Sequence, residues 1–301
     1  MESKRSQENH QKCKIDYEKN LLLRRILTLF AERAHPVQED ENLAKFSVVM
    51  PIHNEAKLLP YSLPSIYRLK PNEVLLLFDR CTDNSPKIAK KMADHCKYAS
   101  RTRFIEINEP SPRWKFRIAF VRRQGFKIAK NHVILNTDAD TMLSEEIADA
   151  IPLIGKSNIG MVKFGRRPYP RTLQSYIGTL ISPFLHVLKG HPAIGFAAIY
   201  AFSKEAWLAT ENPKLAKNVR RAEDTHLYAS ISKKYKAIFI ETRTLHLRPR
   251  ETKENHFLKG VTRWQVKRAP LWMVAAHTFM FLRPPVLSGY LKARLQSKEF
   301  V

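Results

Sequence analysis

Residues 132–141 read HVILNTDADT, a short run of strand character followed by two aspartates, Asp138 and Asp140. In an extended chain, residues i and i+2 point to the same side, so the two carboxylates are expected to face one point. Neighbouring carboxylates repel each other unless a cation or a shared proton lies between them. A hard divalent cation that also binds a diphosphate would satisfy both. The alternative is an acidic turn that caps the next helix.

Strand and helix patterns alternate before these aspartates. Residues 46–50, 73–78, 103–107 and 132–135 have strand character, and helices are expected over 59–69, 85–96 and 118–129. This alternation predicts an α/β fold, a mostly parallel sheet flanked by helices with right-handed crossovers. Ligands of such sheets bind outside the carboxyl ends of the strands. The loops at 51–55, 79–84 and 136–141 should therefore share one crevice.

Several boundaries follow from single residues. Pro51 should end the first strand, and Pro64 should kink or delay the first helix. Ser85 should cap the second helix, because Pro86 suits a first helical position. Beyond Thr141 the pattern is looser, with a helix expected from Ser144 to about residue 154. Further strands are expected at 161–164, 195–202 and 237–240, a near-apolar amphipathic segment at 176–188 and a helix opening at 220–225.

Composition limits the class of protein. The chain has 301 residues, 44% of them hydrophobic, enough for one sizeable core. It carries 52 Lys and Arg against 28 Asp and Glu, a formal net charge of +24. Such a field attracts nucleic acid, anionic membrane or phosphorylated substrates without choosing among them. Cys13, Cys81 and Cys96 lack metal-ligand spacing, which indicates reduced thiols in a cytoplasmic compartment.

Neither a signal peptide nor a membrane span is expected. The first apolar run, at 21–23, is cut by two arginines, and the longest near-apolar runs are 176–188 and 271–282. Both are shorter than the roughly 18–20 residues that span a bilayer. We therefore expect a cytoplasmic protein, peripheral on the cytosolic face of a membrane.

Two extensions flank the expected domain, residues 45–250. Residues 1–44 form a basic N-terminal extension with an amphipathic helix over about 17–30, which either packs on the domain or lies on an anionic membrane. Residues 251–301 form a helical tail in which aromatic residues and cations border apolar stretches. This composition is typical of an interfacial segment on anionic lipid, and the alternative is a helical pair packed on the sheet.

Five ordered motifs resemble those of the family 2 glycosyltransferases of the GT-A fold. They are VMPIHNE at 49–55, DRCTDNS at 79–85, RRQG at 122–125, DAD at 138–140 and ED at 223–224. The resemblance covers about residues 45–250, with a nucleotide-binding half at 45–141 and an acceptor half at 142–250. The chain departs from the family pattern at His53, where Tyr is usual, and at Phe78, where an Asp often precedes Asp79.

The resemblance implies transfer of a sugar from a nucleotide-diphosphate sugar, with inversion at the anomeric carbon. It implies a Mg²⁺ or Mn²⁺ ion that neutralises the leaving diphosphate. The residues implied on the nucleotide side are Pro51, Asn54, Glu55, Asp79, Arg122 and Asp138. The implied metal ligands are Asp138 and Asp140, with His246 as a third ligand or a structural residue.

The acceptor side is implied at the second acidic motif. Asp224 matches the family's base, which takes the proton of the acceptor hydroxyl, and Glu223 lies beside it on the acceptor or diphosphate side. The alternative for Asp224 is a carboxylate favoured by a helix N-terminus. If the acceptor is an ionised lipid phosphate, such as a polyisoprenyl phosphate, Asp224 would orient it instead. A lipid-linked glycan is a further acceptor class that membrane attachment would suit.

Residues 260–264, GVTRW, resemble the Q-x-x-R-W signature of processive polysaccharide synthases, with Gly260 in place of Gln. Arg263 and Trp264 would line the acceptor or diphosphate side, or Trp264 would serve packing. The large transmembrane helices of those synthases are absent from the pattern, so a processive polymerase is not expected. Two other classes remain as alternatives, a nucleotidyltransferase and a basic nucleic-acid-binding protein, although the sequence carries no nucleic-acid-binding signature.

Overall fold

The computed structural model describes residues 44–110, 116–168, 199–212, 217, 223–247, 253–265, 269–280 and 283–296. The helix expected over 17–30 and the segment at 176–188 lie outside these residues, as does the start of the helix expected at 220–225.

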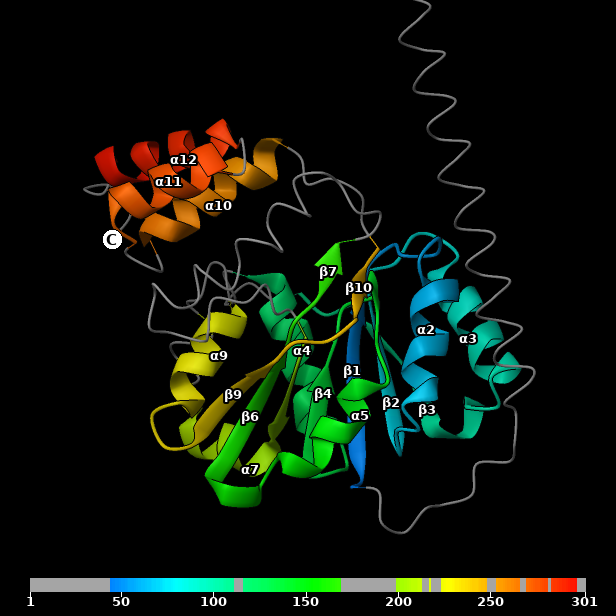
Figure 1. Cartoon of the computed structure of the whole chain (residues 1–301). Coiled ribbons are helices and arrows are strands. Elements are labelled where there is room, and N and C mark those ends of the chain that lie inside the picture. The colour runs from blue at the N-terminus through cyan, green and yellow to red at the C-terminus, as the bar shows by residue number, and fades with distance from the viewer. Residues whose placement is uncertain are drawn as a thin grey trace, which may run out of the picture.

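A seven-stranded sheet forms the centre of the molecule (Figure 1). In spatial order its strands are β3 (Thr102–Ile107), β2 (Glu73–Asp79), β1 (Phe46–Ile52), β4 (Val133–Asn136), β8 (Ile199–Ser203), β6 (Ile159–Phe164) and β9 (Lys236–Ile240). Strand β8 pairs antiparallel with both of its neighbours, and the other pairings are parallel. This confirms the predicted α/β fold with a mostly parallel sheet.

Helices cover both faces of the sheet. On one face, α2 (Leu59–Arg68), α3 (Ser85–His95) and α5 (Glu146–Ala150) pack on the side chains of one core cluster; on the other lie α4 (Arg117–Ile128), α7 (Lys204–Thr210) and α9 (Glu223–Ile231). Neighbouring residues of β1 alternate between the clusters, Val48 in the first and Val49 in the second. With both faces covered, every residue of β1 and β2 is buried, as expected for central parallel strands. Short 3₁₀ helices lie at Ala99–Arg101, Ile151–Leu153 and Lys156–Asn158.

Two boundary predictions were wrong, and a third was wrong in part. Strand β1 continues through Pro51 to Ile52, because Pro51 lies beyond the last pairing with β4, that of Val49 with Asn136, where a missing N–H costs no ladder bond. Helix α2 begins at Leu59 and continues past Pro64, so Pro64 does not delay it, and the expected kink at Pro64 stays a prediction. Ser85 is the first residue of α3 rather than its cap, and its hydroxyl instead accepts the N–H of Glu55 at 2.8 Å.

A three-stranded sheet lies at the carboxyl edge of the large one (Figure 1). Strand β10 (Leu245–His246) pairs antiparallel with β5 (Thr141–Met142) and parallel with β7 (Arg167–Pro168). In this register His246 lies opposite Thr141, directly after the second aspartate. The small sheet therefore brings a residue from the end of the described domain to the DAD motif.

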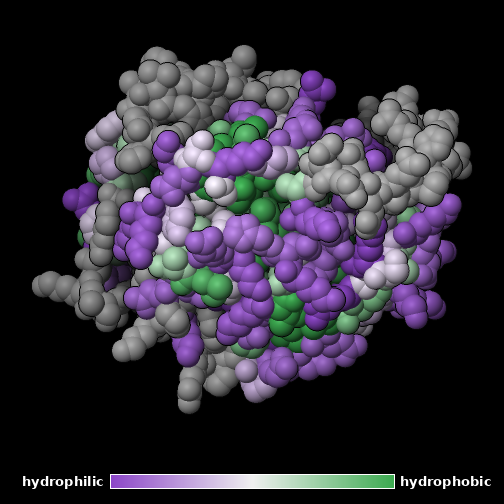
Figure 2. All heavy atoms as spheres, turned by 90° about the horizontal axis from the view of Figure 1, so that it is seen from below, coloured by the Kyte–Doolittle hydropathy of each residue, from purple (hydrophilic) through white to green (hydrophobic). Residues whose placement is uncertain are grey.

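The opposite edge of the large sheet, seen from below in Figure 2, is mostly hydrophilic with scattered apolar side chains. A shallow hollow at this edge is lined by Lys130, Asn131, His132, Lys204, Glu205, Leu208 and Ala209. Because these residues border the amino end of β4 and the carboxyl end of the antiparallel β8, the hollow lies away from the two aspartates.

The C-terminal helices form a unit of their own in the described residues (Figure 1). Helix α10 (Lys253–Gln265) packs closely on α12 (Pro284–Leu295), with α11 (Leu271–Met280) beside α12. A Cβ atom on Gly260 would overlap the carbonyl oxygen of Val286, and one on Gly289 would overlap that of Phe257. The two backbones therefore touch, which explains why glycine stands where the resembling signature has Gln. No described helix is long and apolar enough to cross a membrane.

We expect Gly289→Ala to loosen the C-terminal helical unit. The added methyl must push α12 away from the backbone of Phe257, and overpacking of this kind costs about 1–3 kcal/mol. Limited proteolysis should cleave the variant faster within 253–296. Ser288→Ala, at the exposed neighbouring position, is the control and should be cleaved like the wild type. Equal protection of both variants would contradict the close helix crossing.

Candidate functional site

The first two loops of the predicted crevice are bound to each other at the carboxyl ends of β1 and β2. The Asn54 side-chain oxygen accepts the backbone N–H of Thr82 at 2.8 Å and that of Asp83 at 3.3 Å. Asp83 in turn accepts the N–H of Ala56 at 3.1 Å. Asn54 and Arg80 adopt left-handed backbone conformations, with φ of 55° and 50°. These contacts hold the two loops as one rigid wall.

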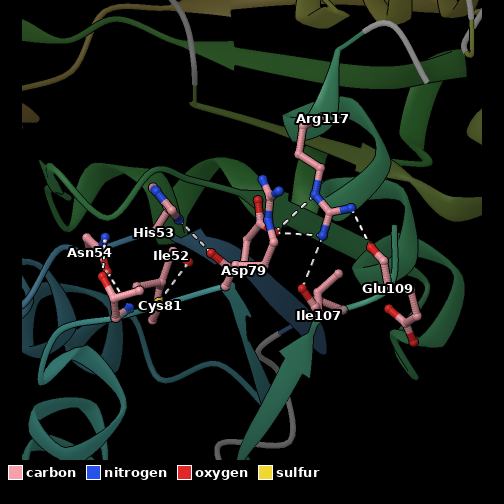
Figure 3. Close-up of polar contacts among 10 residues, drawn as sticks. Ile52, His53, Asn54, Asp79, Cys81, Ile107, Glu109 and Arg117 are labelled. Carbon is pink, nitrogen blue, oxygen red and sulfur yellow. Dashed lines mark hydrogen bonds and ion pairs between the residues drawn. The ribbon is translucent and has the colours of Figure 1, made fainter. Parts of the chain in front are cut away.

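Asp79, at the end of β2, is bound by an arginine that the sequence did not single out (Figure 3). Arg117 donates to Asp79 Oδ1 through Nε at 3.0 Å and through Nη2 at 2.7 Å. It also donates to the carbonyl oxygens of Glu109 at 2.6 Å and Ile107 at 3.1 Å. His53 Nδ1 lies 2.6 Å from the Asp79 carbonyl oxygen and, facing an acceptor, must donate to it. Sequence alone could not pair Arg117 with Asp79, because 38 residues separate them.

Arg122 connects the two predicted halves of the site. Its side chain is buried and donates to Asp138 through Nη2 and to Glu223 through Nη1. Burial alone would lower the pKa of Arg122. The negative charges of Asp138 and Asp224 outweigh this effect and raise the pKa above its ordinary value. Asp138 lies in the turn after β4, and Glu223 is the first residue of α9. One guanidinium thus joins the DAD motif to the ED motif, while its binding to a nucleotide stays a prediction.

The two aspartates do not face the same way. Strand β4 ends at Asn136, so Asp138 and Asp140 lie in a turn and the alternation of an extended chain does not apply. Asp138 turns to Arg122 and, at 3.8 Å, to Arg166. Asp140 Oδ2 lies 3.2 Å from His246 Nε2.

Only two of the three predicted metal ligands therefore lie close together. Asp140 and His246 meet, while Asp138 is engaged by cations. Across the described ranges, no group of three His, Cys, Asp or Glu side chains is placed to hold a metal ion. Asp140 and His246 supply one carboxylate and one imidazole, and a further ligand would have to come from a rearranged Asp138 or from the substrate.

Asp224 is half-buried in the first turn of α9, and its charge acts on a polar pair that the sequence did not predict. Lys163 of β6 pairs with Tyr200 of β8, and both side chains are buried. Burial lowers the pKa of Lys163, opposed by the charge of Asp224, and burial raises the pKa of Tyr200. The Lys163 ammonium lies 5.0 Å from the ring centre of Tyr228. The sequence signal that could have indicated this pair is the position of Lys163 within an apolar strand.

The remaining predicted residues belong to the first loop and to the C-terminal helices. Pro51 and Glu55 border the first loop at the end of β1. Trp264 packs edge-on against Tyr290, with ring centres 5.6 Å apart, which is the packing role left open by the sequence. Burial and the nearby charge of Arg283 lower the pKa of Arg263 to about 10. The acceptor role of Arg263 and Trp264 stays a prediction.

Known proteins resemble the chain in sequence. The model of the family described as glycosyl transferase family 2 matches residues 47–195. An uncharacterized glycosyltransferase of Mycoplasma genitalium is 30% identical over 106 residues, which are 34% of this chain and 34% of that protein. The chain thus matches about a third of the length of this curated relative.

Solved structures resemble it in fold. A mannosyltransferase from Pyrobaculum calidifontis, in complex with GDP-Man and Mn²⁺, has a TM-score of 0.59 at 20% identity, covering 96% of this chain and 86% of that chain. S. aureus TarS 1-349 in complex with UDP has a TM-score of 0.50 at 14% identity, covering 83% of this chain and 88% of that chain. These similarities support the GT-A fold.

We expect Arg122→Met to destabilise the protein strongly, because it leaves the buried Glu223 carboxylate without its partner. The loss in unfolding free energy should be about 3–5 kcal/mol, measured by urea denaturation. Adding Glu223→Gln to Arg122→Met should recover much of it. Arg68→Met removes an ion pair with Glu145 that is open to solvent, and it should cost at most about 1 kcal/mol. An Arg122→Met variant as stable as Arg68→Met would contradict the buried bridge.

Proposed function

We propose that this chain, which belongs to glycosyl transferase family 2 through residues 47–195, transfers a sugar from a nucleotide-diphosphate sugar to an acceptor. One observation carries the proposal: Arg122 joins Asp138 of the nucleotide half to Glu223 of the acceptor half at the carboxyl edge of the sheet. That edge is where open α/β sheets bind ligands. The family match also favours sugar transfer over the nucleotidyltransferase and nucleic-acid-binding alternatives.

In this proposal, Asp79, Asn54 and Glu55 bind the nucleoside, and Asp140 with His246 would bind Mn²⁺ or Mg²⁺. A carboxylate oxygen and an imidazole nitrogen 3.2 Å apart fit as neighbouring ligands of one divalent ion. When bound, the ion would stabilise the charge of the leaving diphosphate. The Pyrobaculum mannosyltransferase of the same fold was solved with GDP-Man and Mn²⁺, which supports this choice of ion.

Asp224 would act on the acceptor. The acceptor oxygen forms a bond to the anomeric carbon from the face opposite the diphosphate, the carbon–diphosphate bond breaks, and the hydroxyl proton moves to the Asp224 carboxylate. This attack inverts the anomeric centre. Lys163, buried next to Asp224, offsets the charge of this carboxylate while no proton is bound. For an ionised phosphate acceptor, Asp224 would orient the acceptor and no base would be needed.

The C-terminal unit would bring the site to a lipid-linked acceptor, such as a polyisoprenyl phosphate or a lipid-linked glycan. On α11, Trp272 is 69% exposed and Phe279 is 74% exposed, and their spacing of seven residues places them on one helix face. Lys292 and Arg294 of α12 add exposed cations. Exposed aromatics beside cations are typical of helices that lie in an anionic membrane interface.

Asp140→Asn should abolish metal-dependent donor turnover. Losing a ligand of an ion that contributes several kcal/mol to the transition state should lower the rate roughly a hundredfold or more. The assay is hydrolysis of UDP-, GDP- and dTDP-sugars with Mn²⁺, Mg²⁺ or EDTA. Asp149→Asn, an exposed aspartate on α5, is the matched control. If the wild-type protein hydrolyses no donor under any of these conditions, the proposed function is wrong.

Asp224→Asn should separate binding from transfer. Donor affinity should stay near that of the wild type, because Asp224 lies on the acceptor side, whereas transfer to a hydroxyl acceptor should fall by about 10²–10⁴-fold. Nucleotide titration and single-turnover transfer assays measure the two effects. Loss of donor binding in this variant would argue against its assignment to the acceptor.

The double variant Trp272→Ser/Phe279→Ser should bind vesicles more weakly. Sedimentation with vesicles of 30% phosphatidylglycerol in phosphatidylcholine, a composition chosen for the assay, should show at least about a tenfold loss of partitioning, because two large apolar groups no longer insert. Leu208→Ser removes an apolar side chain that is 62% exposed on α7 and should leave partitioning unchanged. Equal partitioning of wild type and double variant would contradict a lipid-facing α11.

A further inference from the structure

We propose that the amino edge of the large sheet, the end opposite the proposed transferase site, binds a nucleic-acid duplex through its phosphate groups. The inference goes beyond the proposed function and does not depend on it. It starts from the strand ends at this edge, each of which has a cation beside it. Figure 2 looks onto this edge, which is mostly hydrophilic.

Every strand of the large sheet has a lysine or arginine within three residues of its end at the amino edge. These are Lys45 before β1, Lys70 before β2, Arg101 before β3, Lys130 before β4, Lys156 before β6, Lys234 before β9 and Lys204 directly after the antiparallel β8. Glu205 is the single acidic residue in these flanking positions. At the carboxyl edge, by contrast, acidic residues such as Glu55, Asp138 and Glu241 stand among the arginines. Positive charge without opposing charge is therefore a property of the amino edge.

Most of these cations are open to solvent. The exposed ones are Lys45, Lys70, Lys130, Lys156 and Lys234. Across the described ranges of the chain, none of these five takes part in an ion pair. Glu73, the first residue of β2, is buried and already accepts hydrogen bonds from the Arg103 guanidinium and the Lys130 N–H. Its charge is therefore neutralised inside the protein and does not offset the exposed lysines.

The hollow at this edge offers a place for one phosphate group. Lys204 Nζ donates to the carbonyl oxygens of Ala129 at 2.7 Å and Lys127 at 3.1 Å, which holds the ammonium at the end of α4. An ammonium has three N–H groups, so one remains for a ligand. The exposed Lys130 lines the same hollow, as does Glu205. Two cations thus border the hollow, one of them fixed in position by the backbone.

Helix ends explain only part of this charge. A cation near a helix C-terminus is favoured by the helix dipole, and Lys70, Lys130 and Lys234 follow α2, α4 and α9. Lys45 precedes β1 and follows no helix in the part of the chain that the structure describes, and Lys156 lies in a short 3₁₀ helix. The dipole gives no reason for these two lysines. A cation at all seven strand ends therefore indicates an anion outside the protein.

The arrangement of the cations selects the kind of anion. Neighbouring strands lie about 4.8 Å apart, so the seven strand ends spread the cations over about 30 Å. Such a row does not converge on one small anion, but it matches a linear array of phosphates, the length of about nine base pairs at about 3.4 Å each.

The side chains at this edge favour a duplex over a single strand. Proteins bind single strands by stacking bases on exposed aromatic rings. Tyr235 is the single Phe, Tyr or Trp residue in the flanking positions, and it is half-buried against Gly160. A duplex held by its phosphates needs no aromatic ring, because the contacts are electrostatic.

An anionic membrane is the alternative partner, and the position of the edge argues against it. The C-terminal unit, whose α11 carries the exposed Trp272 and Phe279, lies toward the carboxyl end of the sheet (Figure 1). One flat bilayer cannot contact both ends of the sheet. With α11 on a membrane, the amino edge would face the water.

The test is binding of a fluorescein-labelled DNA duplex of about 20 base pairs, measured by fluorescence anisotropy between about 50 and about 200 mM NaCl. The wild type should bind two duplexes of unrelated sequence equally, with dissociation constants of about 10⁻⁴–10⁻⁶ M at physiological salt, because phosphates carry no sequence information. The triple variant Lys45→Gln/Lys130→Gln/Lys156→Gln should bind roughly tenfold or more weakly. Its slope of log K against log salt concentration should be smaller by about 3.

The matched control removes the same charge elsewhere. Lys87→Gln/Lys90→Gln/Lys91→Gln changes three exposed lysines of α3 and should bind the duplex like the wild type. An equal loss in both variants would show a response to net charge alone and overturn the inference, as would a wild type that binds no duplex.

Two further measurements separate this inference from the other proposals. If the edge variant keeps its affinity for the duplex and loses binding to phosphatidylglycerol vesicles, the edge contacts a membrane and the inference is overturned. Donor hydrolysis should stay unchanged in both triple variants, because their lysines lie outside the proposed transferase site. A failure of the inference would therefore leave the proposed function intact.

Discussion

The buried guanidinium of Arg122 is the interaction on which the site depends. A cation taken out of water is tolerated only when carboxylates and hydrogen bonds compensate for its lost hydration. Arg122 meets this need with Asp138, 16 residues away, and Glu223, 101 residues away. The pairing fixes where α9 begins relative to the turn after β4. It thereby sets the distance between the group that would bind the diphosphate and the carboxylate that would receive the acceptor proton.

The sheet makes this arrangement possible because polar groups can gather only at its rim. Both faces are covered by helices, so the central strands carry apolar side chains along most of their length. The carboxyl ends of β1, β2 and β4 then hold the first loop, Asp79 and the DAD motif side by side. Asn54 and Asp83 bind the two loops to each other, and under the proposed function this preorganisation would lower the entropic cost of nucleotide binding.

The site predictions that failed depend on contacts between residues far apart in the sequence. The two aspartates were read as part of an extended strand, but β4 ends two residues before Asp138, and each carboxylate turns to a different long-range partner. Arg117 was missed for the same reason, since its partner lies on another strand. Gly260 looked like a departure from a motif until the contact between α10 and α12 showed that the packing admits no side chain there.

The sequence by itself determined the fold class, most strands and helices to within a few residues, and the motifs that border the site. These features follow from local patterns of apolar residues, turn residues and glycines, which act over a few positions of the chain. Only the tertiary structure decided that Asp138 faces Arg122, that Asp140 meets His246 across 106 residues, and that Arg117 occupies one oxygen of Asp79. Such pairings depend on how the strands and helices pack, because a charged side chain at the rim turns to whichever opposite charge the fold brings within reach.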